Sequence, residues 1–242
     1  MFNILTLNKI SKVGLDKLDP AKYTCSDSVE APDAILVRSA SMHDMTLSPA
    51  TLAIGRAGAG VNNIPVADFG AQGVAVFNTP GANANAVKEL VLCSLFLASR
   101  KVASAVDWCK TLKGEGDAVG KLVEKGKSAF AGPEILGKTL GVIGLGAIGT
   151  LVAEGAKALG MNIVGYNPGL SEERIADLTS KGIKLMSSLD ELYAASDYIT
   201  LHLPLNDSTR GMINGEAIAK MKDGVRILNF ARGELVDSDA LI

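Results

Sequence analysis

The stretch KTLGVIGLGAIGTLVAEGAKALGMNIVGYNP, residues 138–168, carries the pattern that decides the fold. It opens with an apolar, β-branched run over residues 139–145, which is typical of a buried parallel strand. Apolar residues then recur at helical spacing over residues 148–159, and Gly160 marks a stop. A second short apolar run covers residues 162–166. A strand, a glycine-rich turn, a helix and a strand in this order predict a βαβ unit that binds a dinucleotide.

Glycines at the turn form the motif GxGxxG, and each has its own mechanical role. Gly144 permits a tight turn, Gly146 lets a pyrophosphate approach the backbone, and Gly149 lets the helix and the strand pack closely. The backbone N–H groups near Ala147 and Ile148, in the first helical turn, can bind the negative phosphates. The alternative is an ordinary βαβ crossover without a ligand, because glycine-rich turns are common.

An amide stands where such units usually carry an acidic residue. Position 167, at the end of the second predicted strand, is Asn, whereas a carboxylate commonly binds the adenosine ribose there. Asn167 can donate to a ribose hydroxyl, but it does not repel a 2′-phosphate as a carboxylate does. Glu172 and Glu173 follow closely and Arg174 is the nearby cation, so NAD is favoured over NADP, less strongly than usual.

The composition indicates a globular protein and excludes several classes of partner. The chain has 242 residues, of which 48% are hydrophobic and 21% are charged, and its net charge is −2. No basic cluster suits a nucleic acid, and neither a signal peptide nor a long apolar run predicts a membrane partner. Three cysteines without CxxC spacing predict reduced thiols in the cytoplasm. The two histidines show no metal-ligand spacing, so no metal is expected.

Residues 1–80 alternate short strands with short helices, which predicts a small parallel α/β domain. Ligands bind at the carboxyl edge of such sheets, and polar clusters fall there. Arg38 and Arg56 can each bind a carboxylate or a phosphate through two N–H groups, so we expect an anionic small molecule. The alternative for each cluster by itself is surface arginines and ordinary turns. The predicted strands cover residues 2–7, 23–25, 34–37, 52–57 and 74–77, a helix covers 66–72, and the polar clusters are 38–39, 56–63 and 78–85.

Residues 81–242 predict a larger α/β domain, which begins at a hinge-like Pro80-Gly81. Its last predicted strand ends just before Arg232, at the edge where the cofactor is expected. Arg232 is therefore a candidate for orienting a substrate carboxylate, with a plain surface arginine as the alternative. The other expected elements are a long helix over 84–105, one or two exposed helices over 108–130, a capping box at 188–191, strands over 198–203 and 225–230, and a helix over 214–224.

Several segments together resemble the NAD-dependent D-2-hydroxyacid dehydrogenases, and within that family the phosphoglycerate-oxidising members. The resemblance implies a Rossmann-type doubly wound parallel sheet plus a smaller flavodoxin-like α/β substrate domain, NAD as cofactor, and a homodimer. It also implies oxidation of D-3-phosphoglycerate to 3-phosphohydroxypyruvate by hydride transfer, the first step of serine biosynthesis. The segments are RSASMH (38–43), RAGAGVNNI (56–64), NTPGANANAVKEL (78–90), GKTLGVIGLGAIG (137–149), HLPL (202–205) and MKDGVRILNFARGELVDSDAL (221–241).

The same resemblance assigns roles to individual residues. Arg232 is expected to hold the carboxylate and carbonyl of the substrate, and His202 belongs to the cofactor strand and is not the catalytic histidine. The expected substrate contacts are Arg38, Ser39, Asn83, the backbone of Ala59 and Gly60, and Arg56 for the phosphate. The expected cofactor contacts are Gly144, Gly146, Ala147, Ile148, Gly149, Asn167, Leu203, Pro204, Phe230, Ala231 and Arg232.

The family's catalytic Glu and His are expected after residue 242, as is the segment that completes the first domain. Residues 1–242 are therefore expected to be a C-terminally incomplete form with negligible turnover. One alternative is a dehydrogenase for another D-2-hydroxy acid of the glyoxylate, glycerate or hydroxypyruvate type, although Arg38 and Arg56 favour a phosphorylated substrate. The other alternative is a non-catalytic scaffold that senses NAD.

Overall fold

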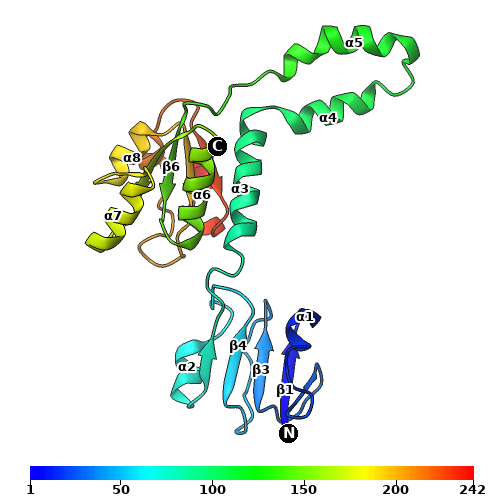
Figure 1. Cartoon of the computed structure of the whole chain (residues 1–242), viewed down its shortest axis with the longest axis vertical. Coiled ribbons are helices and arrows are strands. Elements are labelled where there is room, and N and C mark those ends of the chain that lie inside the picture. Colours follow the sequence, from blue (N-terminus) through cyan, green and yellow to red (C-terminus); the bar gives the residue numbers. More distant parts are fainter. The chain divides into compact units, whose positions relative to one another are not determined.

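The computed structural model describes residues 1–242, which form two compact units, Met1–Asn83 and Ala84–Ile242. Each unit is built on its own five-stranded sheet, and all strand pairs in both sheets are parallel (Figure 1). Short apolar strands joined by helical crossovers produce this arrangement, because parallel neighbours need a long connection. The predicted parallel α/β class is confirmed.

The first unit has the strand order β2-β1-β3-β4-β5. Its core gathers apolar side chains from the middle of the sheet, including Ile35, Val37 and Ile54, against Phe69 of the helix α2. Only two short helices form in this unit, so a full flavodoxin-like layering is not evident. The strands are β1 (Phe2–Leu7), β2 (Tyr23–Ser26), β3 (Ala34–Val37), β4 (Ala53–Arg56) and β5 (Ala75–Phe77), and the helices are α1 (Lys12–Leu15) and α2 (Val66–Ala71).

The second unit has the strand order β10-β9-β6-β7-β8, with β6 at the centre. Counted from β6, this is the order 3-2-1-4-5 read from the opposite edge, which defines a Rossmann-type doubly wound sheet. Successive connections leave β6 in opposite directions, so a crevice opens at the carboxyl ends of β6 and β9. The strands are β6 (Thr139–Ile143), β7 (Asn162–Tyr166), β8 (Lys184–Leu185), β9 (Tyr198–Leu201) and β10 (Arg226–Asn229).

Helices cover both faces of this sheet, because successive side chains of β6 point to opposite faces. Leu140 and Val142 pack with one set of helices, and Ile143 packs with the other. The first face holds α3 (Ala84–Ser99), α6 (Ala147–Ala158) and α7 (Glu172–Ser180), and the second holds α8 (Leu189–Ala195) and α9 (Gly215–Ile218).

Side chains at the N-caps fix the starts of three of these helices. Ser171 accepts a hydrogen bond from the Arg174 N–H, and Asn214 accepts one from the Ala217 N–H. At α8 the Ser188 hydroxyl accepts from the Glu191 N–H at 3.2 Å, which is one half of the predicted capping box. The carboxylate of Glu191 accepts in turn from the Ser187 N–H. No helix of the chain combines the length and the apolar character needed to cross a bilayer.

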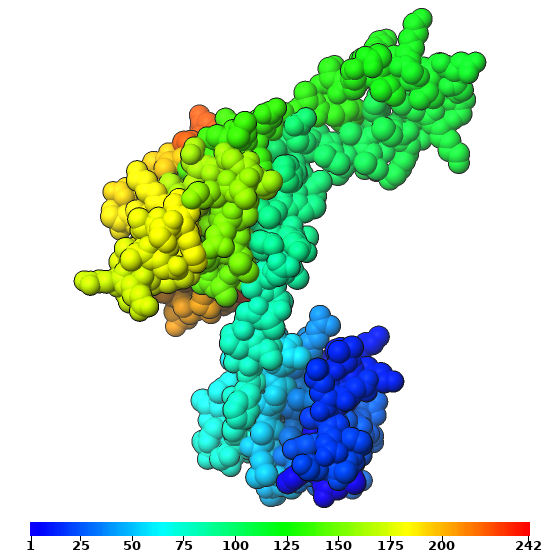
Figure 2. All heavy atoms as spheres, in the orientation of Figure 1, coloured from blue at the N-terminus to red at the C-terminus, as the bar shows by residue number.

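The predicted single helix over residues 84–105 is wrong, because the chain turns between α3 and α4 (Val102–Thr111). Lys101 leaves helical geometry at φ −70° and ψ 48°, and no Gly or Pro marks the position. Ser99 is the last buried residue of α3. The apolar residues of the sequence continue beyond it, but the sheet no longer packs against them. α4 and α5 (Val119–Gly126) project from the rest of this unit (Figures 1 and 2).

Several predicted boundaries are also too long. The strand predicted over 139–145 ends at Ile143, and the strand predicted over 198–203 ends at Leu201. The helix expected to reach Gly224 ends at Ile218. In each case apolar side chains continue past the end of the strand or helix. Composition alone does not distinguish these residues from the residues inside the element.

Candidate functional site

The glycine-rich turn lies at the carboxyl end of β6, beside the crevice. Gly144 has a positive φ of 93°, and a Cβ built on it would lie 2.6 Å from the carbonyl oxygen of His202. A Cβ on Gly149 would lie 1.9 Å from the carbonyl oxygen of Gly144, so only glycine lets α6 approach the turn. Gly146 differs, because nothing lies within 4 Å of its Cβ position. Two of these glycines therefore serve packing, and Gly146 leaves open space.

The first turn of α6 has the properties of an anion site. Gly146 is the N-cap and makes no side-chain capping bond, so this helix end carries N–H groups that no capping side chain satisfies. Gly146 and Ala147 are exposed, and Ile148 is half-buried. A pyrophosphate fits here, because the helix dipole and the free N–H groups both favour negative charge and no side chain blocks the approach.

Asn167 follows β7 and reaches across to the glycine-rich turn. Its Oδ1 accepts from the Leu145 N–H at 3.0 Å, and its Nδ2 donates to the Pro168 carbonyl at 3.0 Å. The side chain is half-buried. Asn167 therefore lies at the crevice, and it also supports the turn.

The end of β9 forms the opposite wall of the crevice. His202 donates its backbone N–H to the Ile143 carbonyl at 2.8 Å, and its Nε2 lies 3.0 Å from Oγ1 of the buried Thr200. Leu203 and Pro204 follow it directly. Burial lowers the pKa of His202 to about 4, because the interior disfavours the charged ring. His202 is thus neutral at physiological pH.

This low pKa predicts an acid-sensitive contribution to stability. The unfolded chain has the ordinary His pKa, so it takes up the proton first as the pH falls from about 6.5 to about 4. Stability should fall through that window by up to roughly 3 kcal/mol from this group. His202→Asn should flatten the change, measured by urea unfolding at several pH values. His43→Asn, at an exposed histidine in the other unit, is the control, and an unchanged pH dependence in His202→Asn would contradict the assignment.

The turn after β10 presents Arg232 at the same edge of the sheet. Asn229 holds this turn, because its Nδ2 donates to the Arg232 carbonyl at 2.7 Å and its Oδ1 accepts from the Ala231 N–H at 3.0 Å. Arg232 is exposed, and its Nη1 donates only to the neighbouring Ala231 carbonyl at 3.0 Å. The guanidinium is therefore available to an anion. Phe230 and Ala231 are half-buried between the strand and this turn.

The first unit brings its polar clusters together at the carboxyl edge of β3, β4 and β5. One cavity of about 490 Å³ is lined by five of the six residues expected to contact a substrate: Arg38, Ser39, Arg56, Ala59 and Asn83. The sixth, Gly60, is not among the lining residues. Gly58 also lines this cavity, and a Cβ there would lie 1.7 Å from Nη1 of Arg56. The absence of a side chain at Gly58 therefore leaves the space that the Arg56 guanidinium occupies.

Two asparagines hold these loops: Asn78, which begins the predicted polar cluster 78–85, and Asn8, which sequence reasoning did not single out. Asn8 follows β1 with a left-handed φ of 65°, and its Oδ1 accepts from the Ser39 N–H at 2.9 Å. Asn78 donates to the Ala59 carbonyl at 2.7 Å, which turns the N–H of the same peptide in the opposite direction. Asn8 directly follows β1, so the carboxyl-edge argument could have found it as well.

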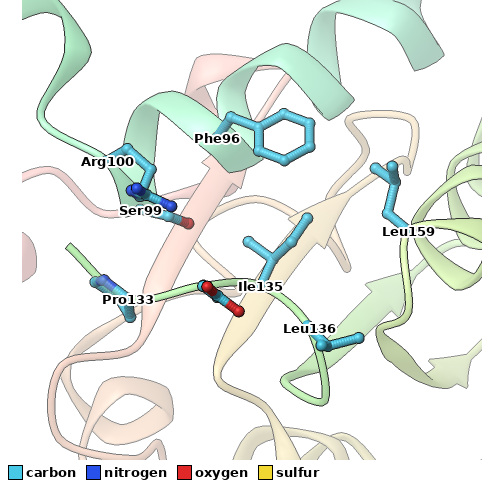
Figure 3. Close-up of a pocket in the computed structure, with 8 residues that line it drawn as sticks. Phe96, Ser99, Arg100, Pro133, Ile135, Leu136 and Leu159 are labelled. Atoms are coloured by element: carbon cyan, nitrogen blue, oxygen red, sulfur yellow. The ribbon is translucent and has the colours of Figure 1, made fainter.

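A second cavity, of about 180 Å³, lies near the amino end of β6 in the second unit. Phe96, Ile135 and Leu136 contribute apolar surface, and Ser99 and Arg100 lie at the end of α3 (Figure 3). The Ser99 hydroxyl is not free to bind a ligand in this cavity, because it is hydrogen-bonded to the Tyr198 hydroxyl at 2.7 Å. No residue predicted for the cofactor or the substrate lines this cavity.

Residues 92–242 match the family described as D-isomer specific 2-hydroxyacid dehydrogenase, NAD binding domain. The chain belongs to this family, and the match covers the glycine-rich turn, Asn167, the end of β9 and Arg232. NAD as the cofactor of this domain is thereby confirmed.

Similar proteins include enzymes with different substrates in their names. The chain is 42% identical over 217 residues to D-3-phosphoglycerate dehydrogenase of Mycobacterium bovis, covering 88% of this chain and 38% of that protein. It is 42% identical over 212 residues to hydroxypyruvate reductase of Thermotoga maritima, covering 86% and 63%. The crystal structure of NAD⁺-bound 3-phosphoglycerate dehydrogenase of Entamoeba histolytica has a TM-score of 0.71 at 26% identity, covering 99% of this chain and 75% of that one. The chain thus spans less than two thirds of the length of both curated relatives.

Proposed function

We propose that this chain serves the NAD-dependent oxidation of D-3-phosphoglycerate to 3-phosphohydroxypyruvate. The observation that carries the proposal is the cavity of the first unit, where Arg38 and Arg56 line one space. The Nε of Arg56 is buried there without a hydrogen-bond partner, as expected of a group that awaits an anion. A phosphate of charge near −2 suits two guanidinium groups, because each can donate two parallel hydrogen bonds.

Each unit has a separate part in the proposed reaction. In the second unit, the first turn of α6 binds the pyrophosphate of NAD, Asn167 contacts the adenosine ribose, and Arg232 orients the carboxylate and carbonyl of the substrate. We propose residues 1–80 as the substrate domain and residues 81–242 as the NAD-binding domain, with Asn83 and Arg232 contacting the substrate from beyond residue 80. NAD, when bound, would supply the hydride acceptor for C2 of the hydroxy acid, and the hydroxyl proton would leave to a general base as the C2–O bond becomes a carbonyl. The side chains of this chain position both molecules for that transfer.

The second candidate is a dehydrogenase for an unphosphorylated D-2-hydroxy acid. The likeness to hydroxypyruvate reductase of Thermotoga maritima favours it, because the identity equals that to the phosphoglycerate enzyme. Arg38 and Arg56 distinguish the two candidates, since an unphosphorylated acid offers one anionic group where D-3-phosphoglycerate offers two.

Calorimetric titration of the chain with D-3-phosphoglycerate and with D-glycerate tests this choice. Arg56→Ala and Arg38→Ala should each weaken binding of the phosphorylated acid by about 10-fold or more, with a much smaller effect on D-glycerate. Gly58→Ala should act like Arg56→Ala, because the added methyl displaces the guanidinium. Arg100→Ala, at the other cavity, is the matched control. Equal losses on both acids would favour the unphosphorylated substrate, and NADH formation by the full gene product would check the reaction.

We also propose a homodimer in the cytoplasm. Apolar side chains on the outer faces of α3 and α4 support the dimer, since Leu97 is 47% exposed and Val106 is 51% exposed. All three cysteines are free thiols, which suits a reducing compartment. Sedimentation velocity should show a dimer for the unmodified chain and a monomer for Val106→Glu. A monomeric unmodified chain would contradict the proposal.

A further inference from the structure

Arg174, in the first turn of α7, reaches the back of the glycine-rich turn. One nitrogen, Nη2, donates to the Leu145 carbonyl at 3.2 Å and to Oγ1 of Thr150 at 2.7 Å. The other, Nη1, pairs with the carboxylate of Asp177. The Thr150 hydroxyl donates to the same Leu145 carbonyl at 3.2 Å. Leu145 is 2% exposed and Thr150 is 7% exposed, whereas the Arg174 side chain is 35% exposed, so these bonds join buried acceptors to a half-buried guanidinium.

The N–H and the carbonyl of Leu145 are therefore both hydrogen-bonded, on the side of the turn that faces Asn167 and α7. Asn167 accepts from its N–H, and Arg174 and Thr150 donate to its carbonyl. The Leu145 carbonyl and the Gly146 N–H belong to one planar trans peptide, so they point in opposite directions. Directing the carbonyl toward Arg174 thus directs the Gly146 N–H toward the open side of the turn, where the Cβ position of Gly146 has no neighbour within 4 Å.

We propose that Arg174 is a positioning residue for the dinucleotide: with Thr150 it sets the peptide orientation that presents the Gly146 N–H to the pyrophosphate. The inference rests on the cofactor part of the proposed function. It also means that Arg174 is engaged by Asp177, Leu145 and Thr150. The one cation near Asn167 is then not free to bind a 2′-phosphate.

Titration of the chain with NADH, followed by ligand fluorescence, tests the role. Arg174→Met should raise the Kd for NADH by about 10-fold, because the carbonyl loses a charged donor. Lys181→Met is the matched control, since Lys181 also pairs with Asp177 and with Glu154 but touches no part of the turn. It should stay within about twofold of the unmodified chain.

A comparison of ligands separates positioning from general destabilisation. The loss in Arg174→Met should appear with ADP-ribose, which contains the pyrophosphate, and be absent with adenosine. Thr150→Val, which removes the hydroxyl, should also weaken NADH binding, whereas Thr150→Ser, which keeps it, should bind NADH like the unmodified chain. This pair tests the positioning role even if Arg174→Met does not fold. Unchanged NADH binding in Arg174→Met, or equal losses for ADP-ribose and adenosine, would overturn the inference. Failure of the unmodified chain to bind NADH would instead count against the proposed cofactor site.

Discussion

Gly146→Asp is expected to abolish measurable NADH binding and to leave the fold intact. The Cβ position of Gly146 faces open space, so the side chain can be accommodated without moving a neighbour. The new carboxylate would stand at the N-terminus of α6, where the pyrophosphate is expected to bind. Two like charges about 4 Å apart repel by roughly 4 kcal/mol at the effective dielectric of a protein surface, and even part of that energy raises the Kd about 100-fold.

Two further variants separate charge from volume at this position. Gly146→Asn has the same shape as the aspartate variant without its charge, and Gly146→Ala adds only a methyl group. We expect the Kd to rise in the order Ala, Asn, Asp, with thermal unfolding of all three close to that of the unmodified chain. Tight NADH binding by Gly146→Asp would show that the pyrophosphate does not lie at this helix end.

Gly149→Ala is expected to have the opposite profile, with a large loss of stability. The added Cβ would lie 1.9 Å from the Gly144 carbonyl oxygen, which is backbone and cannot rotate away. Overpacking of this kind typically costs about 1–3 kcal/mol, and we expect the upper end because α6 must shift from the sheet. For a protein of this size, such a loss lowers the Tm by roughly 10 °C.

Differential scanning calorimetry with and without NADH checks this expectation. Gly146→Ala is the matched control, because it adds the same methyl group three residues earlier with nothing in its way. A Tm for Gly149→Ala within about 2 °C of the control would mean that α6 has room to move. The close approach of helix and strand would then not depend on glycine.

Four of the five strands of the second sheet were predicted, because each has a distinct apolar run, whereas the two-residue strand β8 was not predicted. Residues 138–168 form β6, α6 and β7 in the expected order, with Gly144 and Gly146 in the turn and Gly149 in the first turn of α6. The polar clusters of the first unit also met at one edge, because parallel strands place their carboxyl ends together. These features follow from local pattern and from one rule of topology.

Other features depend on partners that are far apart in the chain. The break at Lys101 follows from where the sheet ends beneath α3, and no residue type marks it. The position of Asn8 after β1 could be found from the sequence, but its bond to a loop about thirty residues later appears only when β1 and β3 lie side by side. The sequence indicates Arg174 only as a charge near a 2′-phosphate, and its contact with Leu145 depends on the position of α7.

The glycine-rich turn has a consequence for how this domain can vary among descendants. Its proposed contacts to the pyrophosphate are main-chain N–H groups, so no side-chain donor can be exchanged at the point of contact. Heritable changes that tune cofactor affinity without blocking the site can instead arise in the layer behind, at positions such as Thr150 and Arg174. Substitutions that adapt the cofactor affinity of this site would then be found at residues that do not contact the ligand.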